Sequence, residues 1–202
     1  MLSRSALLRI AANVVSKRNK GLFKDLKRRY PNVPDYVMKQ VYSGGKDNLA
    51  RSDTYEQMLK TYDKMEWSLE KVDLHWKNLN GITKNNIRRR KFGLENPDEV
   101  PEDAERLKRQ IESLAGEGKN EPMVFLETEG GLELVEGFHR TMALLLKGSP
   151  DLEKTFTELA KASDAEIDKM ASSWKPVPAE AWVGKGGGSG EEQVEMPEGD
   201  FF

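Results

Sequence analysis

Apolar residues recur at intervals of three and four along much of the chain, the spacing that places side chains on one face of an α-helix. Residues 2–18 combine this spacing with basic residues, which predicts a basic amphipathic helix. Asp35 begins a short helix that Ser43-Gly44-Gly45 ends. From Ser52 the pattern predicts a longer helix, and Asn80-Gly81 closes the helical region. Its apolar stripe, which we interpret as core packing, comprises Tyr55, Met58, Leu59, Tyr62, Met65, Leu69 and Val72.

Strand patterns join the helical ones beyond Gly81. A charged amphipathic helix is predicted over residues 102–115. Strands over 122–127 and 132–135 flank the turn Glu129-Gly130-Gly131 and predict a hairpin. The later elements are helices over 140–147 and within 151–173, and a last short strand over 178–183. Helices with a small number of strands predict an α+β fold.

The composition excludes several classes of protein. The 202 residues include no cysteine, which excludes a disulfide framework, a thiolate metal site and a thiol nucleophile. The only two histidines, His75 and His139, are too few for a His-rich metal site. No apolar run approaches the ~20 residues that span a bilayer, so an integral membrane protein is not expected. We expect a soluble, intracellular protein.

The formal net charge of −2 is the sum of two opposed regions. Residues 1–91 carry 21 basic and nine acidic side chains, a net charge of +12, whereas residues 92–202 carry a net charge of −14. The basic helix at the start is open to three interpretations: a mitochondrial presequence, a helix that lies on nucleic acid or anionic lipid, and a helix packed on the rest of the protein. Residues 191–202 are acidic and end in Phe201-Phe202. They are either a solubilising end or a segment that binds a basic surface of this chain or of a protein partner.

A dense basic cluster precedes the second helical region. Adjacent cations favour contact with phosphates because each releases condensed counterions. The candidate nucleic-acid-binding residues are Arg88, Arg89, Arg90 and Lys91. The alternative interpretation of this cluster is a solvated face.

The most informative segment for chemistry is LELVEGFHRTMALLLKG, residues 132–148, which predicts a strand, a glycine and then a helix. The first turn of such a helix offers N–H groups and a positive dipole end to a phosphate. His139 and Arg140 fall in that turn, where Arg140 can chelate phosphate oxygens and His139 can donate a hydrogen bond or shuttle a proton. Glu136 precedes the glycine and is the candidate magnesium ligand or base. The alternative is that Arg140 pairs with a surface carboxylate and His139 caps the helix.

Several pieces in order resemble the ParB/sulfiredoxin superfamily: the helix over 102–115, GKNEPMVF, the hairpin, LVEGFHRTMALL, acidic helices and VPAEAWV. The resemblance covers residues 72–183. It implies a small mixed sheet with flanking helices, preceded by a basic helical extension (1–71) and followed by a Gly-rich linker with an acidic, disordered tail (184–202).

In members of this superfamily the corresponding box binds nucleotide phosphates, with ATP in sulfiredoxin and in a free-serine kinase and CTP in chromosome-partitioning proteins. The resemblance therefore implies an ATP or CTP ligand. The residues that match the box are Gly137, His139 and Arg140, with Thr141 as a weaker candidate. Lys119 and Asn120 match the loop that opens the preceding strand, where some members contact the nucleotide.

Two departures from the superfamily limit what the resemblance implies. Phe138 stands where sulfiredoxin has its catalytic cysteine, so sulfinic-acid chemistry is not expected. The helix-turn-helix domain of the partitioning proteins has no counterpart after the box, so operator recognition of that type is not expected.

Three functions follow as hypotheses. The first is a nucleotide-binding protein of phage or mobile-element type, in which Glu136 with Mg²⁺ promotes phosphoryl transfer or nucleotide hydrolysis and His139 and Arg140 stabilise the developing charge. The second is a nucleic-acid-binding or nuclease-like protein that uses residues 1–30 and 88–91. The third is a structural or assembly protein that keeps the fold without the activity. The expected location is the cytoplasm of a bacterial host or a virion, with the mitochondrial matrix as the alternative.

Overall fold

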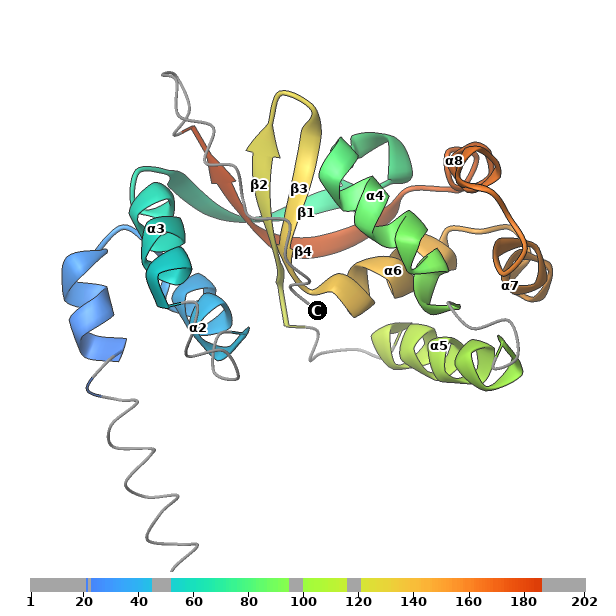
Figure 1. Cartoon of the computed structure of the whole chain (residues 1–202), viewed down its shortest axis with the longest axis horizontal. Helices are drawn as coiled ribbons and strands as arrows, with labels where there is room; N and C mark the ends of the chain where they lie inside the picture. Colours follow the sequence, from blue (N-terminus) through green and yellow to red (C-terminus); the bar gives the residue numbers. More distant parts are fainter. Residues whose placement is uncertain (1–20, 22, 45–51, 95–99, 116–120, 187–202) are drawn as a thin grey trace, which may run out of the picture.

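A mixed four-stranded sheet with helices on both faces forms the centre of the structure, which confirms the predicted α+β class (Figure 1). The computed structural model describes residues 21, 23–44, 52–94, 100–115 and 121–186. The residues 2–18 for which a basic helix is predicted, together with Lys119, Asn120 and residues 191–202, lie outside these residues.

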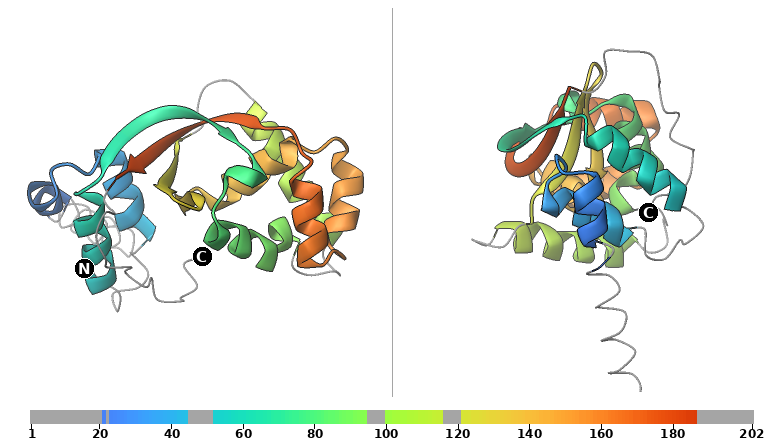
Figure 2. Two further views of the ribbon diagram at one scale, coloured as in Figure 1. Left: turned by 90° about the horizontal axis from the view of Figure 1, so that it is seen from above. Right: turned by 90° about the vertical axis from the view of Figure 1, so that its left-hand side faces the viewer.

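The sheet has the strand order β1-β4-β2-β3. Its strands are β1 (Glu66–Leu74), β2 (Met123–Thr128), β3 (Gly131–Glu136) and β4 (Val177–Lys185). β1 pairs antiparallel with β4, β4 pairs parallel with β2, and β2 pairs antiparallel with β3 as the predicted hairpin. Seen from above, the two long strands β1 and β4 curve from the N-terminal helices at one end of the molecule to the last helices at the other (Figure 2).

The helices occur in three groups along the chain. Residues 23–29 are helical and precede α2 (Asp35–Gly44) and α3 (Ser52–Tyr62). Between β1 and β2 lie α4 (Gly81–Arg89) and α5 (Val100–Ala115), with the short 3₁₀ segments η2 (Trp76–Asn78) and η3 (Lys91–Gly93) at either end of α4. Between β3 and β4 lie α6 (Phe138–Lys147), α7 (Leu152–Leu159) and α8 (Asp164–Ala171). No helix in the described part of the chain is both long enough and apolar enough to cross a membrane.

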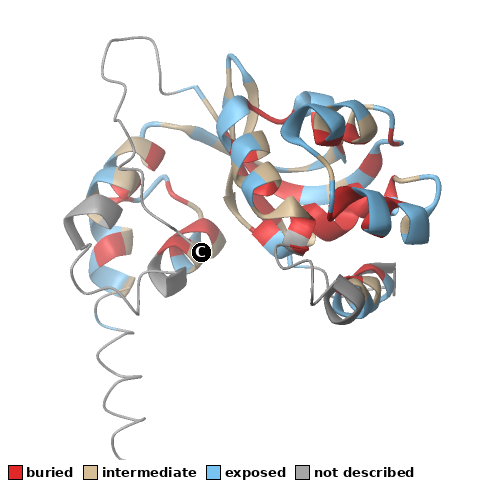
Figure 3. Ribbon diagram, turned by 45° about the vertical axis from the view of Figure 1, so that its right-hand side comes forward, coloured by how far each residue is buried: buried red, intermediate tan, exposed pale blue. Residues whose placement is uncertain are grey.

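Successive residues of β2 point to opposite faces of the sheet and so belong to two different hydrophobic cores. Met123 and Phe125 pack with α6 and the later helices, whereas Val124 and Leu126 pack with the N-terminal helices. Figure 3 shows α6 as the most continuously buried helix, and its residues 141–146 are all buried. A strand buried on both faces holds the start of α6 in a fixed position, because neither core can shift without the other.

The long helix predicted from Ser52 to residue 72 is wrong beyond Tyr62. The chain turns there, and strand β1 begins at Glu66, so the sheet starts before the expected domain boundary at residue 72. Met65, Leu69 and Val72 have helical spacing. With their neighbours Trp67 and Leu74, however, they also recur at two-residue steps, first on one face of a strand and then on the other. The segment forms a strand because this conformation lets Trp67 pack against the core of the N-terminal helices while Leu74 is buried in the core around α6. The interpretation of Leu59 and Tyr62 as core residues is confirmed, whereas that of Leu69 is wrong, because Leu69 lies on β1 and is 48% exposed.

Two further expectations are corrected. Asn80-Gly81 does not end the helical region, because the Asn80 side chain accepts a hydrogen bond from the Thr83 N–H and caps the start of α4. Gly184 was assigned to the flexible linker but is a buried residue of β4. The indole of Trp67 covers it so closely that a Cβ there would lie 3.0 Å from the ring, and this contact extends the strand past residue 183.

Candidate functional site

The predicted strand–glycine–helix junction is present, with Gly137 between β3 and α6. Gly137 has a φ of +98°, a backbone conformation that side chains rarely adopt. A Cβ on this residue would also lie 2.9 Å from the Met123 Cγ. The glycine is therefore required both by its dihedral angle and by the close approach of β2.

Gly137 is the N-cap of α6 and has no side-chain oxygen to accept from the first N–H groups of the helix. Asn80 and Asp151 supply such an oxygen to α4 and α7, respectively. The first turn of α6 thus presents its N–H groups and the positive end of the helix dipole without a neutralising cap side chain.

Cationic side chains gather around this turn. His139 is exposed, and its ring meets the Phe138 ring edge-on at 6.0 Å between centroids. The pKa of His139 is lowered from the ordinary 6.5, first by partial desolvation and then by the positive charges of Arg90 and Arg106. The Glu136 carboxylate acts in the opposite direction but does not cancel these effects. The neutral imidazole is therefore favoured at pH 7, first by partial burial and then by the neighbouring cations.

Arg90 reaches the junction from the end of α4. Its guanidinium carbon lies 5.3 Å from the centroid of the Phe138 ring. The chain reverses just after Arg90 through two residues with positive φ, Lys91 at 42° and Phe92 at 60°. Such strained residues persist where packing holds them, and Phe92 is fully buried against the indole of Trp174 at 5.3 Å between centroids. The buried Phe92 thus anchors the turn that places Arg90 beside α6.

Arg106 is a site residue that the sequence pattern did not single out. It lies on α5, whose predicted amphipathic character is confirmed, and α5 packs on α6 through buried Leu107 and Ile111. The sequence contained one signal for Arg106: it is the neighbour of Leu107, which belongs to the apolar face predicted to pack, and so it lies at the edge of that face. Only the docking of α5 on α6 brings it near His139.

Arg140 makes backbone contacts instead of the carboxylate contact considered as the alternative. Its Nη1 donates to the carbonyl of Glu121 and lies 3.5 Å from the carbonyl of Pro122. The hydroxyl of Tyr36, on α2, donates to the same Pro122 carbonyl at 2.8 Å. Arg140 therefore holds the segment that leads into β2, and its role in chelating phosphate stays a prediction.

Thr141 contributes to the core and not to the exposed end of α6. Its side chain is fully buried, and its hydroxyl donates to the sulfur of Met123 at 3.1 Å. A ligand at the helix terminus would not reach this hydroxyl without repacking of Met123. The weaker assignment of Thr141 to the phosphate site is corrected accordingly.

Glu136 is half-buried at the end of β3 and influences His139 electrostatically. Within the described ranges, no group of three or more His, Asp or Glu side chains that could hold a metal ion is found. A single carboxylate fits Mg²⁺ only where phosphates and water supply the remaining ligands. The role of Glu136 as a magnesium ligand stays a prediction.

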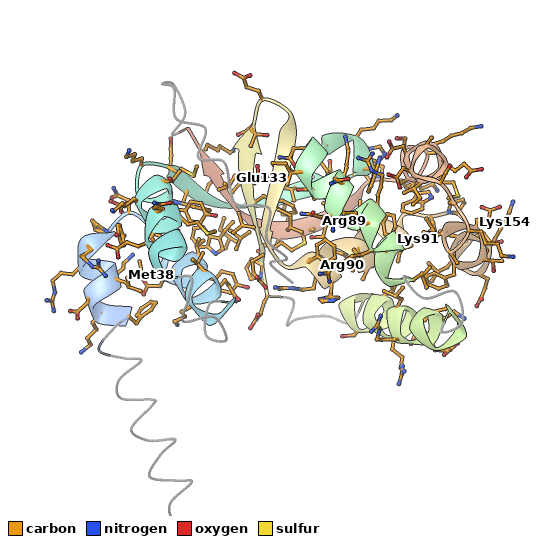
Figure 4. The ribbon with its side chains drawn as sticks, in the orientation of Figure 1. Met38, Arg89, Arg90, Lys91, Glu133 and Lys154 are labelled. Atoms are coloured by element: carbon orange, nitrogen blue, oxygen red, sulfur yellow. The ribbon has the colours of Figure 1, made fainter. Side chains whose placement is uncertain are left out.

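The basic cluster at residues 88–91 does not form one continuous surface. Arg88 makes two hydrogen bonds to the carboxylate of Asp168, at 2.9 and 3.1 Å, and Lys91 donates to the carbonyl of Ala160 at 2.9 Å. These two cations attach α4 and η3 to the region of α7 and α8. Arg89 is exposed, and Arg90 faces the α6 junction (Figure 4). The four adjacent basic side chains thus point to three different surroundings: the α7 and α8 region, the solvent and the start of α6.

His75 has a structural role. Its Nδ1 accepts a hydrogen bond from the Lys77 N–H, and its Nε2 lies 3.0 Å from the Trp174 carbonyl.

Comparisons with protein-family models, with curated proteins and with solved structures find no match to this chain. The likeness to the ParB/sulfiredoxin superfamily therefore rests on the motifs in the sequence.

Proposed function

We propose that this protein binds the phosphate groups of a nucleotide at the N-terminus of α6, in the manner implied by its likeness to ParB/sulfiredoxin-like proteins. The observation that carries the proposal is the surroundings of His139. Two arginines from two other elements, Arg90 and Arg106, act on this imidazole at the uncapped start of a helix. A polyanion at the start of α6 would be attracted by the positive charges of both arginines.

The geometry suits a polyphosphate better than a single carboxylate. The N–H end of α6 supplies one anion position, Arg90 lies against the Phe138 ring beside it, and the charges of Arg90 and Arg106 both act on His139 in the same turn. Guanidinium groups chelate phosphate oxygens bidentately, so several cations can engage successive phosphates. ATP or CTP is the ligand class that the superfamily resemblance adds.

A catalytic role is a further step of the same proposal. Glu136 is the carboxylate next to the junction and would take the part of base or ligand to a nucleotide-bound Mg²⁺, which supplies charge neutralisation when present. His139, neutral at pH 7, can donate a hydrogen bond to phosphate or accept a proton. Arg140 would join them only after leaving the carbonyls of Glu121 and Pro122.

The nucleic-acid alternative has less support from the described residues. Arg88 and Lys91 are committed to contacts within the protein, which removes half of the proposed contact surface at 88–91. Residues 1–30 are the other part of that proposal, and of these residues 1–20 and 22 lie outside the described residues.

Calorimetric titration with ATP, CTP and GTP, with and without Mg²⁺, tests the proposal. Wild type should bind one of them with a Kd below about 1 mM. Arg106→Glu should weaken binding at least about tenfold, because it replaces an attraction by a repulsion beside the phosphates. Arg109→Glu is the matched control: it reverses the same charge on the same helix, where Arg109 Nε donates to the Glu105 carbonyl. Equal losses in the two variants, or no binding by wild type, would reject the proposed site.

A further inference from the structure

The N-terminal helices reach the proposed phosphate site through one side chain. Tyr36 lies on α2, which packs on the sheet through the buried residues Val37, Met38 and Val41. From there its hydroxyl donates to the carbonyl of Pro122, 86 positions further along the chain. That carbonyl immediately precedes β2, the strand whose Met123 touches Gly137. α2 and the box thus meet at the entrance to β2.

Arg140 is engaged at the same place. Its Nη1 donates to the Glu121 carbonyl and lies 3.5 Å from the Pro122 carbonyl to which Tyr36 donates. Burial raises the pKa of the Tyr36 phenol, whereas a hydrogen bond from Arg140 and its positive charge lower it. The guanidinium therefore donates to the Glu121 carbonyl and lies beside the Pro122 carbonyl to which Tyr36 also donates.

An arginine that is engaged with neutral backbone oxygens cannot also chelate a phosphate without giving up some of those contacts. Charge-assisted bonds to phosphate are roughly twice as strong as bonds to neutral oxygens, so a phosphate can displace them. The cost of displacement lowers the apparent affinity for the ligand. Whatever strengthens the resting contacts of Arg140 weakens binding at the box, and the reverse also holds.

We propose that Tyr36 is a positioning residue that holds Arg140 in a resting arrangement against the carbonyls of Glu121 and Pro122, so that the N-terminal helices restrain phosphate binding at the box. This inference rests on the proposed function. Binding of a polyphosphate draws Arg140 towards the start of α6 and releases Tyr36 from its guanidinium. By reciprocity, a partner that moved α2 away from the sheet would raise the affinity of the box for its ligand.

Tyr36→Phe tests the inference because it removes the hydroxyl and keeps the ring, which packs on the core between the N-terminal helices and the sheet. The probes are ATP and inorganic tripolyphosphate, measured by calorimetry. Losing one restraining hydrogen bond should tighten binding by about two- to tenfold. Tyr30→Phe is the matched control, since the Tyr30 hydroxyl lies 3.2 Å from the Glu56 carboxylate within the N-terminal helices and takes no part in the contacts of Arg140.

A double variant separates a positioning role from a general loosening of the helices. In an Arg140→Ala background, Tyr36→Phe should no longer change the affinity, because the restrained group is gone. Hydrogen exchange at the amides of residues 36–41 should increase when the ligand binds to wild type. Tighter binding in Tyr30→Phe as well would overturn the positioning role.

The remaining outcomes are distinct. If wild type binds the ligand and Tyr36→Phe binds equally or more weakly, the restraint is refuted while the proposed function stands. If neither ATP nor tripolyphosphate binds to wild type or to Tyr36→Phe, the proposed function fails, and the restraint fails with it.

Discussion

The guanidinium of Arg90 and the ring of Phe138 lie one above the other, with 5.3 Å between the guanidinium carbon and the ring centroid. This contact joins the end of α4 to the first residue of α6. The aromatic ring of Phe138 therefore keeps the positive charge of Arg90 beside the start of α6.

Removing the Arg90 side chain should raise the pKa of His139, because the charge of Arg90 lowers it. Two-dimensional NMR of Arg90→Ala across a pH series measures this, and His75, the only other histidine, gives an internal reference. Arg89→Ala is the control, since Arg89 is the exposed neighbour of Arg90. An equal rise in the control would show that the effect comes from overall charge and not from the position of Arg90.

The lowered pKa of His139 makes stability depend on pH. Because the unfolded chain, with the ordinary pKa of 6.5, binds the proton more readily than the folded protein, the free energy of unfolding is highest above pH 6.5. It should decrease as the pH falls through the lowered pKa of the folded state. Urea unfolding of wild type and His139→Gln at pH 8, 6.5 and 5 isolates this contribution. A difference between the two proteins that stays constant with pH would contradict it.

Gly137→Ala should destabilise the protein by about 1–3 kcal/mol, since it places a Cβ at positive φ and against Met123. Gly81→Ala is the matched control: Gly81 begins α4, and a Cβ there would meet nothing within 4 Å. This second change should be neutral or slightly stabilising, because alanine favours helix. Chemical denaturation of both variants measures the difference, and equal effects would show that the Gly137 geometry is unimportant.

Arg88 should contribute to stability through Asp168. A double-mutant cycle with Arg88→Ala and Asp168→Ala should give a coupling free energy of about 0.5–2 kcal/mol, since the pair is hydrogen-bonded twice and the arginine side chain is only 21% exposed. Arg89→Ala, in the exposed neighbour, should change stability by less than about 0.5 kcal/mol. A coupling near zero would return Arg88 to the candidate nucleic-acid-binding residues.

Local patterns were sufficient for much of the fold. The hairpin of β2 and β3, the helices α2 and α5, and the final strand each have a complete signal within their own residues. The strand β1 does not, because its residues pack on two different cores and its apolar spacing fits a helix equally well. Its assignment depends on pairing with β4, more than 100 residues away in sequence, which no local pattern contains.

The candidate site divides in the same way. Gly137 and His139 follow from the strand–glycine–helix pattern, and both lie where that pattern requires. Arg106 and Tyr36 come from elements that dock on α6 and on the sheet, so their positions depend on tertiary packing alone. At residues 88–91 the sequence suggested one surface where the structure has none. These adjacent residues lie on a short helix and turn, so their side chains point to different neighbours.

NMR titration of the wild-type protein with ATP at pH 7 tests the central claim most directly. The largest chemical-shift changes should occur at the backbone amides of residues 138–140 and should saturate at or below about 1 mM ATP. The His139 ring should at the same time move towards its protonated form, because the phosphates offset the charges of Arg90 and Arg106 that lower its pKa. Changes confined to other parts of the protein, or an unchanged His139 at saturation, would contradict phosphate binding at the start of α6.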